Sequence, residues 1–341
     1  MKEKKTYIFK YYQKSVLLMK HTLKVTLILV LVFIIAQIIG LGIVNEYIDH
    51  QTTVETGNVT FHTGLGGQEA PDMGESPTYF VFYIAGIVLL GTIIVLLMIR
   101  FQKVNIWKLW FLTAVTICLA YAFYRFLLKL FPSVSTATWV AVGIGLFLGY
   151  FKVYRPNIYI HNATEIFVYG GLAAILVPIE VFTIWSAVGI LLLISLYDMY
   201  AVWKSKHMIK MAEFQSDAKV FAGLLIPYKR PGKGKKKEAK IKTKTSPKKA
   251  VKSESIKTAV LGGGDIGFPL LFAGVVMKSL MLENSAGIGF LKTMIIPVFV
   301  TIALLVLLLR SKKNRFYPAM PFITAGCFLG YGALMLLEML F

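Results

Sequence analysis

Hydrophobic residues follow one another in long uninterrupted runs along this chain, and polar residues gather in the stretches between them. Several runs reach the ~20 residues that an α-helix needs to cross a bilayer. They lack the alternation of polar and apolar positions that is typical of an outer-membrane β-barrel. We therefore predict an all-α polytopic membrane protein of about nine transmembrane helices, near residues 23–44, 78–99, 109–130, 134–151, 162–177, 181–202, 259–281, 287–309 and 318–341.

The composition supports this class. Hydrophobic residues make up 57% of the 341 residues, more than a soluble protein of this length can cover. The net charge of +20 lies almost wholly in loops and tails, so it reports on topology rather than on a nucleic-acid partner. Both cysteines, Cys118 and Cys327, fall inside apolar runs and form no disulfide framework or metal-ligand cluster. We expect no metal, no cofactor and no nucleic acid.

The charges of the loops predict the orientation of the chain. Lysines crowd the segment before the first run, whereas residues 45–77 contain acidic residues and no Lys or Arg. By the positive-inside rule the N-terminus is then cytoplasmic and residues 45–77 form an outer loop. Every later loop fits the same alternation, which leaves the C-terminus outside. The first run is long enough to span and lacks a clear cleavage site, so we expect a multi-pass protein of the cell membrane.

Three parts follow from this pattern: six helices in residues 1–202, a lysine-rich cytoplasmic loop in residues 203–258, and three helices in residues 259–341. Residues 208–228 retain some helical amphipathicity. Residues 231–257 have almost no apolar content, so we predict that they are disordered. The loop is either a solvated linker or a segment that contacts anionic lipid headgroups.

Two aspartates interrupt otherwise apolar runs. Asp198 lies near the end of the sixth run and Asp265 near the start of the seventh. An ionisable side chain is costly inside a membrane and indicates a functional site when a partner exists. Asp198 precedes Lys204 by six residues, ~9 Å of helix, and Asp265 follows Lys257 by eight, ~12 Å if that stretch is helical. Both carboxylates are therefore predicted at similar depth, in the cytoplasmic third of the bilayer.

Two carboxylates in contact do not both ionise at low cost, so the pair shares a proton and titrates as a unit. Such a pair can hydrolyse a peptide bond, because one group acts as base toward water while the other donates to the carbonyl oxygen. Structural pairing, ion coupling and proton relay are other uses of membrane aspartates.

The neighbouring residues favour a substrate site. Gly262 and Gly264 weaken the start of the seventh helix and allow close backbone approach, or else serve tight helix packing. Tyr197 either covers the site or anchors its helix at the interface. Pro318 and Pro321 prevent a regular start to the ninth helix. Irregular backbone at membrane depth is tolerated where it lines a cavity, and it can bind an extended substrate.

Together these residues resemble the presenilin and signal peptide peptidase family of intramembrane aspartyl proteases. That family carries Tyr-Asp in its sixth span, Gly-x-Gly-Asp in its seventh and Pro-Ala-Leu at its ninth. The orientation and the short chain are most similar to an archaeal presenilin homologue, since signal peptide peptidases run the opposite way. The matching residues here are Tyr197-Asp198, Gly262-Gly263-Gly264-Asp265 and Pro318-Ala319-Met320, with Met for the family's Leu.

The resemblance implies an aspartyl endopeptidase that cleaves transmembrane segments of membrane proteins within the bilayer. Asp198 and Asp265 would be catalytic, and the tyrosine, glycines and Pro-Ala-Met segment would shape the cleft. A rival hypothesis is a cation transporter or ion-leak channel that binds cations at the same aspartates, with help from Glu165. The sequence leaves the oligomeric state open, including a homo-oligomer.

Overall fold

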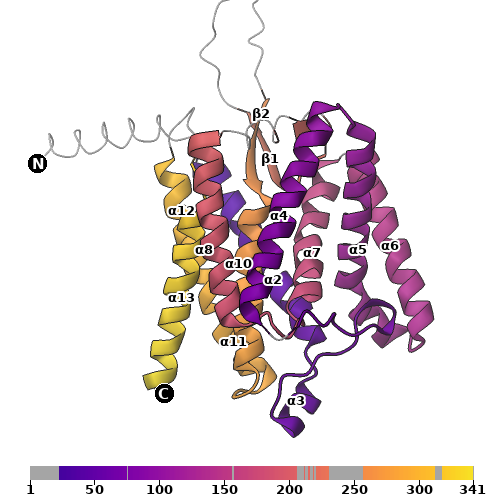
Figure 1. Ribbon diagram of the computed structural model, residues 1–341, viewed down its shortest axis with the longest axis vertical. Coiled ribbons are helices and arrows are strands. Elements are labelled where there is room, and N and C mark those ends of the chain that lie inside the picture. The colour runs from indigo at the N-terminus through magenta and orange to yellow at the C-terminus, as the bar shows by residue number, and fades with distance from the viewer. Residues whose placement is uncertain are drawn as a thin grey trace, which may run out of the picture.

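The computed structural model describes residues 23–74, 76–155, 157–205, 220–229, 256–311 and 317–340, with 211, 214, 215 and 218. Helices dominate these ranges (Figure 1). The N-terminal half contains α2 (Leu23–Tyr47), α3 (His50–Thr56), a 3-10 turn (Leu65–Gly67), α4 (Pro77–Arg100), α5 (Val104–Leu130), α6 (Val134–Tyr154), α7 (Ile158–Leu176) and α8 (Ile184–Tyr200), which ends in a π-helical turn (Ala201–Ser205). The C-terminal half contains strands β1 (Gly223–Lys229) and β2 (Ile256–Gly262), then α10 (Gly263–Leu280), α11 (Ala286–Thr293), α12 (Ile295–Arg310) and α13 (Met320–Leu340).

The predicted helical membrane architecture is confirmed at a coarse level. Within the described ranges, eight helices are long and apolar enough to cross a membrane. The predicted fifth span, α7, is a 19-residue helix that is not among them. Its apolar pattern is broken by polar residues such as His161, Glu165 and Tyr169, which are buried inside the protein. The count of nine spans and the orientation of the termini stay predictions.

Helix α10 lies at the centre of the bundle and packs against α2, α7, α8 and α13. Two thirds of its membrane-length window, 67%, is buried, whereas only 11% of the window in α4 is buried. Ile266, Leu270 and Phe272 on α10 belong to the largest buried cluster. The window in α10 is the least apolar of the eight, with a mean hydropathy of 1.2 against 2.8 in α4, so it is the helix that loses least when protein rather than lipid covers its faces. The segment carrying Asp265 is therefore held from several directions.

The expectation of an all-α fold is wrong in one place. Strands β1 and β2 form an antiparallel two-stranded sheet in which Gly223 pairs with Gly262 and Lys229 with Ile256. The sheet sits at the end of the bundle opposite to α3 (Figure 1). Exposure alternates along β2, where Thr258 and Val260 are exposed and Ala259 and Leu261 buried. This period of two is the signature of a strand with one buried face.

The sheet changes two sequence-based boundaries. The seventh helix begins at Gly263 rather than near residue 259. Residues 223–229 are a strand, although residues 208–228 are expected to be weakly helical. An extended chain rises about 3.3 Å per residue, so Lys257 lies roughly 20 Å of chain from Asp265 rather than ~12 Å. Of the stretch predicted to be disordered, residues 256 and 257 belong to β2. The remainder, with the basic N-terminal segment, lies outside the described residues.

Candidate active site

The carboxylate of Asp198 caps the start of another helix. Asp198 lies near the C-terminal end of α8 and is 5% exposed. Its Oδ2 accepts a hydrogen bond of 3.1 Å from the backbone N–H of Met320, the first residue of α13. The first amides of a helix lack partners within the helix and carry a partial positive charge, which favours an anion. The sixth and ninth predicted spans therefore meet at Asp198.

A second contact one turn away fixes this junction. The hydroxyl groups of Ser195 on α8 and Thr324 on α13 are 2.7 Å apart, and both side chains are buried. Ser195 precedes Asp198 by three residues, and Thr324 follows Met320 by four, so both contacts lie on facing sides of the two helices. Pro318 and Ala319 precede α13 and are not helical, as expected for a segment that contains proline.

The second aspartate lies at the start of its own helix. Asp265 is the third residue of α10, and its carboxylate accepts a hydrogen bond from the backbone N–H of Gly262, the N-cap residue. This is one half of a capping box, the bond from the first turn back to the cap, because Gly262 has no side chain to make the other half. A Cβ on Gly262 would come within 3.3 Å of Asp265 Oδ2. Glycine at this position therefore leaves room for the carboxylate.

The two carboxylates are close enough for the charge of Asp198 to act on Asp265. Each lies at the positive end of a helix, Asp198 at α13 and Asp265 at α10. Asp198 is buried and Asp265 is half-buried. Like charges in such surroundings favour a state in which one carboxyl keeps its proton. The geometry thus suits a pair in which one member acts as an acid and the other as a base.

The other two glycines of the run have different surroundings. A Cβ on Gly263 would lie 2.5 Å from the hydroxyl oxygen of Tyr169, so a side chain cannot be placed there without movement. Gly264 is exposed, and a Cβ on it would make only ordinary contacts, at 3.5 Å from Phe268. Gly263 is therefore needed for packing against α7, whereas the backbone at Gly264 is open to a ligand.

The side chain of Tyr197 contacts α4. Its hydroxyl lies 3.0 Å from the hydroxyl of Thr92 on α4, so this side chain joins α8 to α4. Helix α4 is the least buried of the membrane-length helices in the described ranges. Tyr197 therefore anchors a loosely held helix next to the site, and this contact does not cover the carboxylates.

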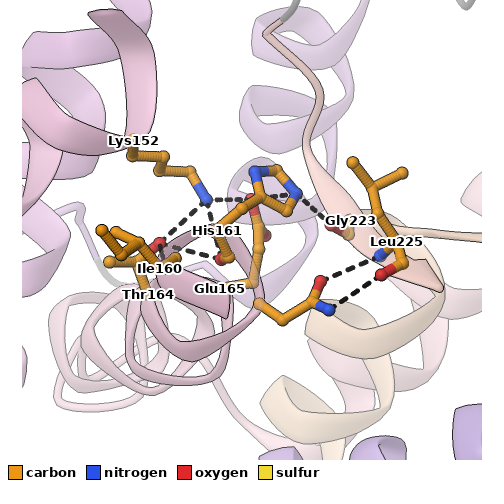
Figure 2. Close-up of polar contacts among 8 residues, drawn as sticks. Lys152, Ile160, His161, Thr164, Glu165, Gly223 and Leu225 are labelled. Atoms are coloured by element: carbon orange, nitrogen blue, oxygen red, sulfur yellow. Dashed lines mark hydrogen bonds and ion pairs between the residues drawn. The ribbon is translucent and has the colours of Figure 1, made fainter. Parts of the chain in front are cut away.

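The acidic residue of the transporter hypothesis is already neutralised. Glu165 Oε1 lies 2.6 Å from the ammonium of Lys152 on α6, and the two side chains are 2% and 1% exposed (Figure 2). A carboxylate held by a buried lysine is not available to a cation. Among the residues that the structure describes, no three His, Cys, Asp or Glu side chains are grouped as a metal site would need.

Comparison with known proteins decides the family. A family model described as signal-peptide peptidase, presenilin aspartyl protease matches residues 67–339, which is most of the chain. The chain belongs to this family. The resemblance drawn from the Tyr-Asp, Gly-x-Gly-Asp and Pro-Ala motifs is thereby confirmed at the level of the family. The archaeal assignment stays a prediction.

Solved structures of the presenilin family share the fold. A presenilin family intramembrane aspartate protease in a C222 space group is 18% identical, with a TM-score of 0.58, over 92% of this chain and 99% of that one. Such a protease in a P2 space group gives 18% identity and a TM-score of 0.54, over 91% and 96%. No curated protein matches the sequence. At this identity the likeness shows a presenilin-like fold and leaves the roles of individual residues to the geometry.

Several residues of this presenilin-family site are missed by sequence reasoning. Thr324 on α13 contacts Ser195 on α8, the helix of Asp198, and Tyr169 on α7 contacts Gly263 in the turn before Asp265. Serine, threonine and tyrosine are common in membrane helices, so their identity alone indicates nothing. The spacing of Ser195 from Asp198 and of Thr324 from Met320 is the one available signal, because it places each pair on one helix face.

Proposed function

We propose that this presenilin-family protein is an intramembrane aspartyl endopeptidase in which Asp198 and Asp265 form the catalytic pair. The observation that carries the proposal is that two packed helices, α8 and α10, each carry a carboxylate at the N-terminal end of a helix, with Asp265 within range of the charge of Asp198. Membership of a family of intramembrane aspartyl proteases supports it. The effect of the Asp198 charge on Asp265 supports such a pair, because acid–base catalysis needs one protonated and one ionised carboxyl.

The reaction uses both carboxyls on one water molecule. The ionised carboxylate takes a proton from water as the oxygen attacks the peptide carbonyl carbon, and the protonated carboxyl donates to the carbonyl oxygen. The resulting gem-diol intermediate then breaks at the C–N bond: the newly protonated carboxyl gives its proton to the leaving nitrogen, and a diol hydroxyl gives its proton to the other carboxylate as the C=O bond re-forms. The carboxyl pair ends with the same number of protons with which it began. Which aspartate is the base is open in this scheme.

The substrate is a transmembrane segment that has lost helical structure near the site, because a peptide bond inside a helix is shielded by its own hydrogen bonds and side chains. Two features support binding of an extended chain. The backbone before Met320 is non-helical, and β2 is an edge strand of the two-stranded sheet with Val260 44% exposed. Extended peptides bind such backbone through main-chain hydrogen bonds. Gly264 and Pro318-Ala319-Met320 would line this cleft.

The proposed placement has the site near the cytoplasmic face, with the N-terminus inside and the C-terminus outside. The sheet and α3 lie at opposite ends of the bundle, which supports a lysine-rich loop and an acidic loop on opposite sides of the membrane (Figure 1). Water would then reach the aspartates from the sheet side. The bilayer and transmembrane proteins are the proposed partners.

The test is cleavage of a tagged transmembrane peptide by the purified protein in detergent. We expect cleavage by the parent chain and its loss in Asp198→Asn and in Asp265→Asn, with inhibition by a transition-state analogue of aspartyl proteases. Asp72→Asn, at an exposed loop position, is the matched control and should cleave as the parent does. Cleavage that persists in either active-site variant of folded protein contradicts the proposal.

A further inference from the structure

Helix α7 carries a row of buried polar side chains that the proposed reaction does not use. His161, Glu165 and Tyr169 are spaced by four residues, so they lie along one face of the helix. All three are buried, at 7%, 1% and 6% exposed. Buried polar groups in a membrane protein are costly unless they are bonded, and they are commonly functional. The contacts of this row show where it acts.

The first turn of α7 holds strand β1. His161 Nε2 lies 2.8 Å from the carbonyl oxygen of Gly223, so this nitrogen carries the proton and donates it. The amide of Asn162 donates to the carbonyl of Leu225 at 2.8 Å and accepts from the N–H of Leu225 at 2.9 Å. Figure 2 shows His161 turned toward Gly223 beside these bonds. The Asn162 amide thus replaces a neighbouring strand on that edge, while β2 pairs with the other edge.

The middle of the row contains the buried ion pair. The ammonium of Lys152 contacts Glu165 Oε1 at 2.6 Å and the hydroxyl of Thr164 at 3.2 Å (Figure 2). The other carboxylate oxygen, Glu165 Oε2, and the Tyr169 hydroxyl are both buried without a hydrogen-bond partner in the described part of the chain, and the charge of Glu165 acts on that hydroxyl. A small adjustment or one bridging water would join them.

The last member of the row reaches the turn that bears Asp265. The Tyr169 hydroxyl packs against Gly263, two residues before Asp265, where a Cβ would lie 2.5 Å from it. The charges of Glu165 and Asp265 both act on this hydroxyl, and so does Cys118. Tyr169 therefore stands between a charge-neutralised pair and a carboxyl of the proposed catalytic pair.

We propose that Tyr169 is a positioning residue for Asp265, with the Lys152–Glu165 pair as its anchor. Glu165 holds the hydroxyl, the hydroxyl holds the glycine turn at the start of α10, and the turn sets the direction of the Asp265 carboxyl. His161 and Asn162 hold the same turn from the other side, through β1 and β2. This inference rests on the proposed protease function.

The first experiment compares Tyr169→Phe with Tyr124→Phe. Tyr124 is a matched control, since its hydroxyl is also buried without a partner in the described residues, but it packs with Ala137 and Ala141 in a separate cluster. We expect Tyr169→Phe to lower kcat about tenfold, with KM unchanged, because a less firmly held turn leaves the Asp265 carboxyl less often in the reactive direction. The acid limb of its pH profile should move to higher pH. Equal kcat and pH profiles in parent, Tyr169→Phe and Tyr124→Phe overturn the inference.

A second readout needs no catalysis. Hydrogen exchange of the backbone amides of residues 263–266 should rise about tenfold in Tyr169→Phe and not in Tyr124→Phe, since the turn is less firmly held. Unchanged exchange contradicts the positioning role even if no substrate is cleaved. Conversely, the protease function is supported if the parent chain cleaves substrate and Asp265→Asn fails to cleave it. This holds whatever the result for Tyr169→Phe.

Two double variants decide the case if Tyr169→Phe fails to fold. Lys152→Met with Glu165→Gln keeps an acceptor for the tyrosine hydroxyl, whereas Lys152→Met with Glu165→Leu removes it, and neither leaves an unpaired charge. We expect kcat of the Leu form to be about tenfold below that of the Gln form. Equal kcat and equal amide exchange at residues 263–266 in the two forms contradict the proposal.

Discussion

Two pairs of ionisable side chains lie inside this bundle, and their surroundings differ. Lys152 and Glu165 have opposite charges, lie 2.6 Å apart and are almost wholly buried. Asp198 and Asp265 have like charges, and each is stabilised by a helix N-terminus rather than by a countercharge. The members of the first pair neutralise each other's charge. Under the proposed function, the second pair exchanges protons, which is what a hydrolytic site requires.

The difference shows how a membrane protein uses buried charge. A neutralised pair fixes the relative position of the two helices that carry it, because the short contact restricts both side chains. It needs no ligand to balance its charge. A like-charge pair is retained at a cost in stability and is useful only if substrate or water reaches it. On this basis the ion pair is expected to matter most for the fold and the aspartates for the chemistry. The following variants test that division.

The largest expected effect on the fold comes from Lys152→Met. Removing one partner leaves the Glu165 carboxylate buried and uncompensated, so the free energy of unfolding should fall by about 3–5 kcal/mol. Replacing both partners, by Lys152→Met with Glu165→Leu, should return stability to near that of the parent. Unfolding in detergent measures both. If the single and double variants are equally unstable, the two side chains do not neutralise each other's charge as described above.

Gly263→Ala should have the next largest effect. Its Cβ would clash with the Tyr169 hydroxyl, and overpacking of this kind costs about 1–3 kcal/mol. In Gly264→Ala the added Cβ has room, so stability should be equal to that of the parent or slightly higher, as expected for alanine in a first helical turn. The same methyl group should obstruct the proposed cleft. Stability and cleavage of the two variants should therefore separate. A stable, fully active Gly263→Ala would contradict the close packing of α7 against this turn.

The smallest effect concerns a carboxylate in water. Asp49 caps α3 as Asp198 caps α13, and the backbone amide of Thr52 holds the pKa of Asp49 below its usual value. A lowered pKa means that the stabilisation is present above the unfolded pKa, near pH 4, and is lost as pH falls through the folded pKa. Because solvent screens this site, Asp49→Ala should cost less than about 1 kcal/mol.

Amide exchange in α3, corrected for the intrinsic rate, measures this effect. Protection should fall below about pH 4 in the parent, since Asp49 then takes up its proton. In Asp49→Ala protection should be lower throughout and lack that pH dependence. If Asp49→Ala loses all amide protection in α3 at neutral pH, the cap stabilises this solvent-exposed helix by more than the small amount expected here. That result would contradict the prediction.

Sequence patterns predict the parts of this protein that depend on single segments. Apolar runs locate most of the helices, and the rarity of Asp198 and Asp265 within them identifies the two acids. The strands are missed because β2 is a short apolar stretch that continues into α10, and an apolar run without clear periodicity does not separate strand from helix. Its alternation of exposure becomes visible only once β1 is placed beside it.

Contacts between distant segments are beyond such patterns. The partner of Gly263 is Tyr169, and the partner of Tyr197 is Thr92. Glu165 looks like a free membrane carboxylate until Lys152 is found beside it. In each case the partner is fixed by tertiary packing, which local spacing does not encode.

The most direct test of the central claim is a double-variant cycle on the aspartates. Rates of cleavage are measured for the parent, Asp198→Asn, Asp265→Asn and the double variant, each with its unfolding transition checked. If the two carboxyls act as one unit, each single variant should lose at least about 10³-fold in kcat and the double variant no more than either. Losses that multiply in the double variant, or a single variant that retains parental activity, would contradict a shared catalytic pair.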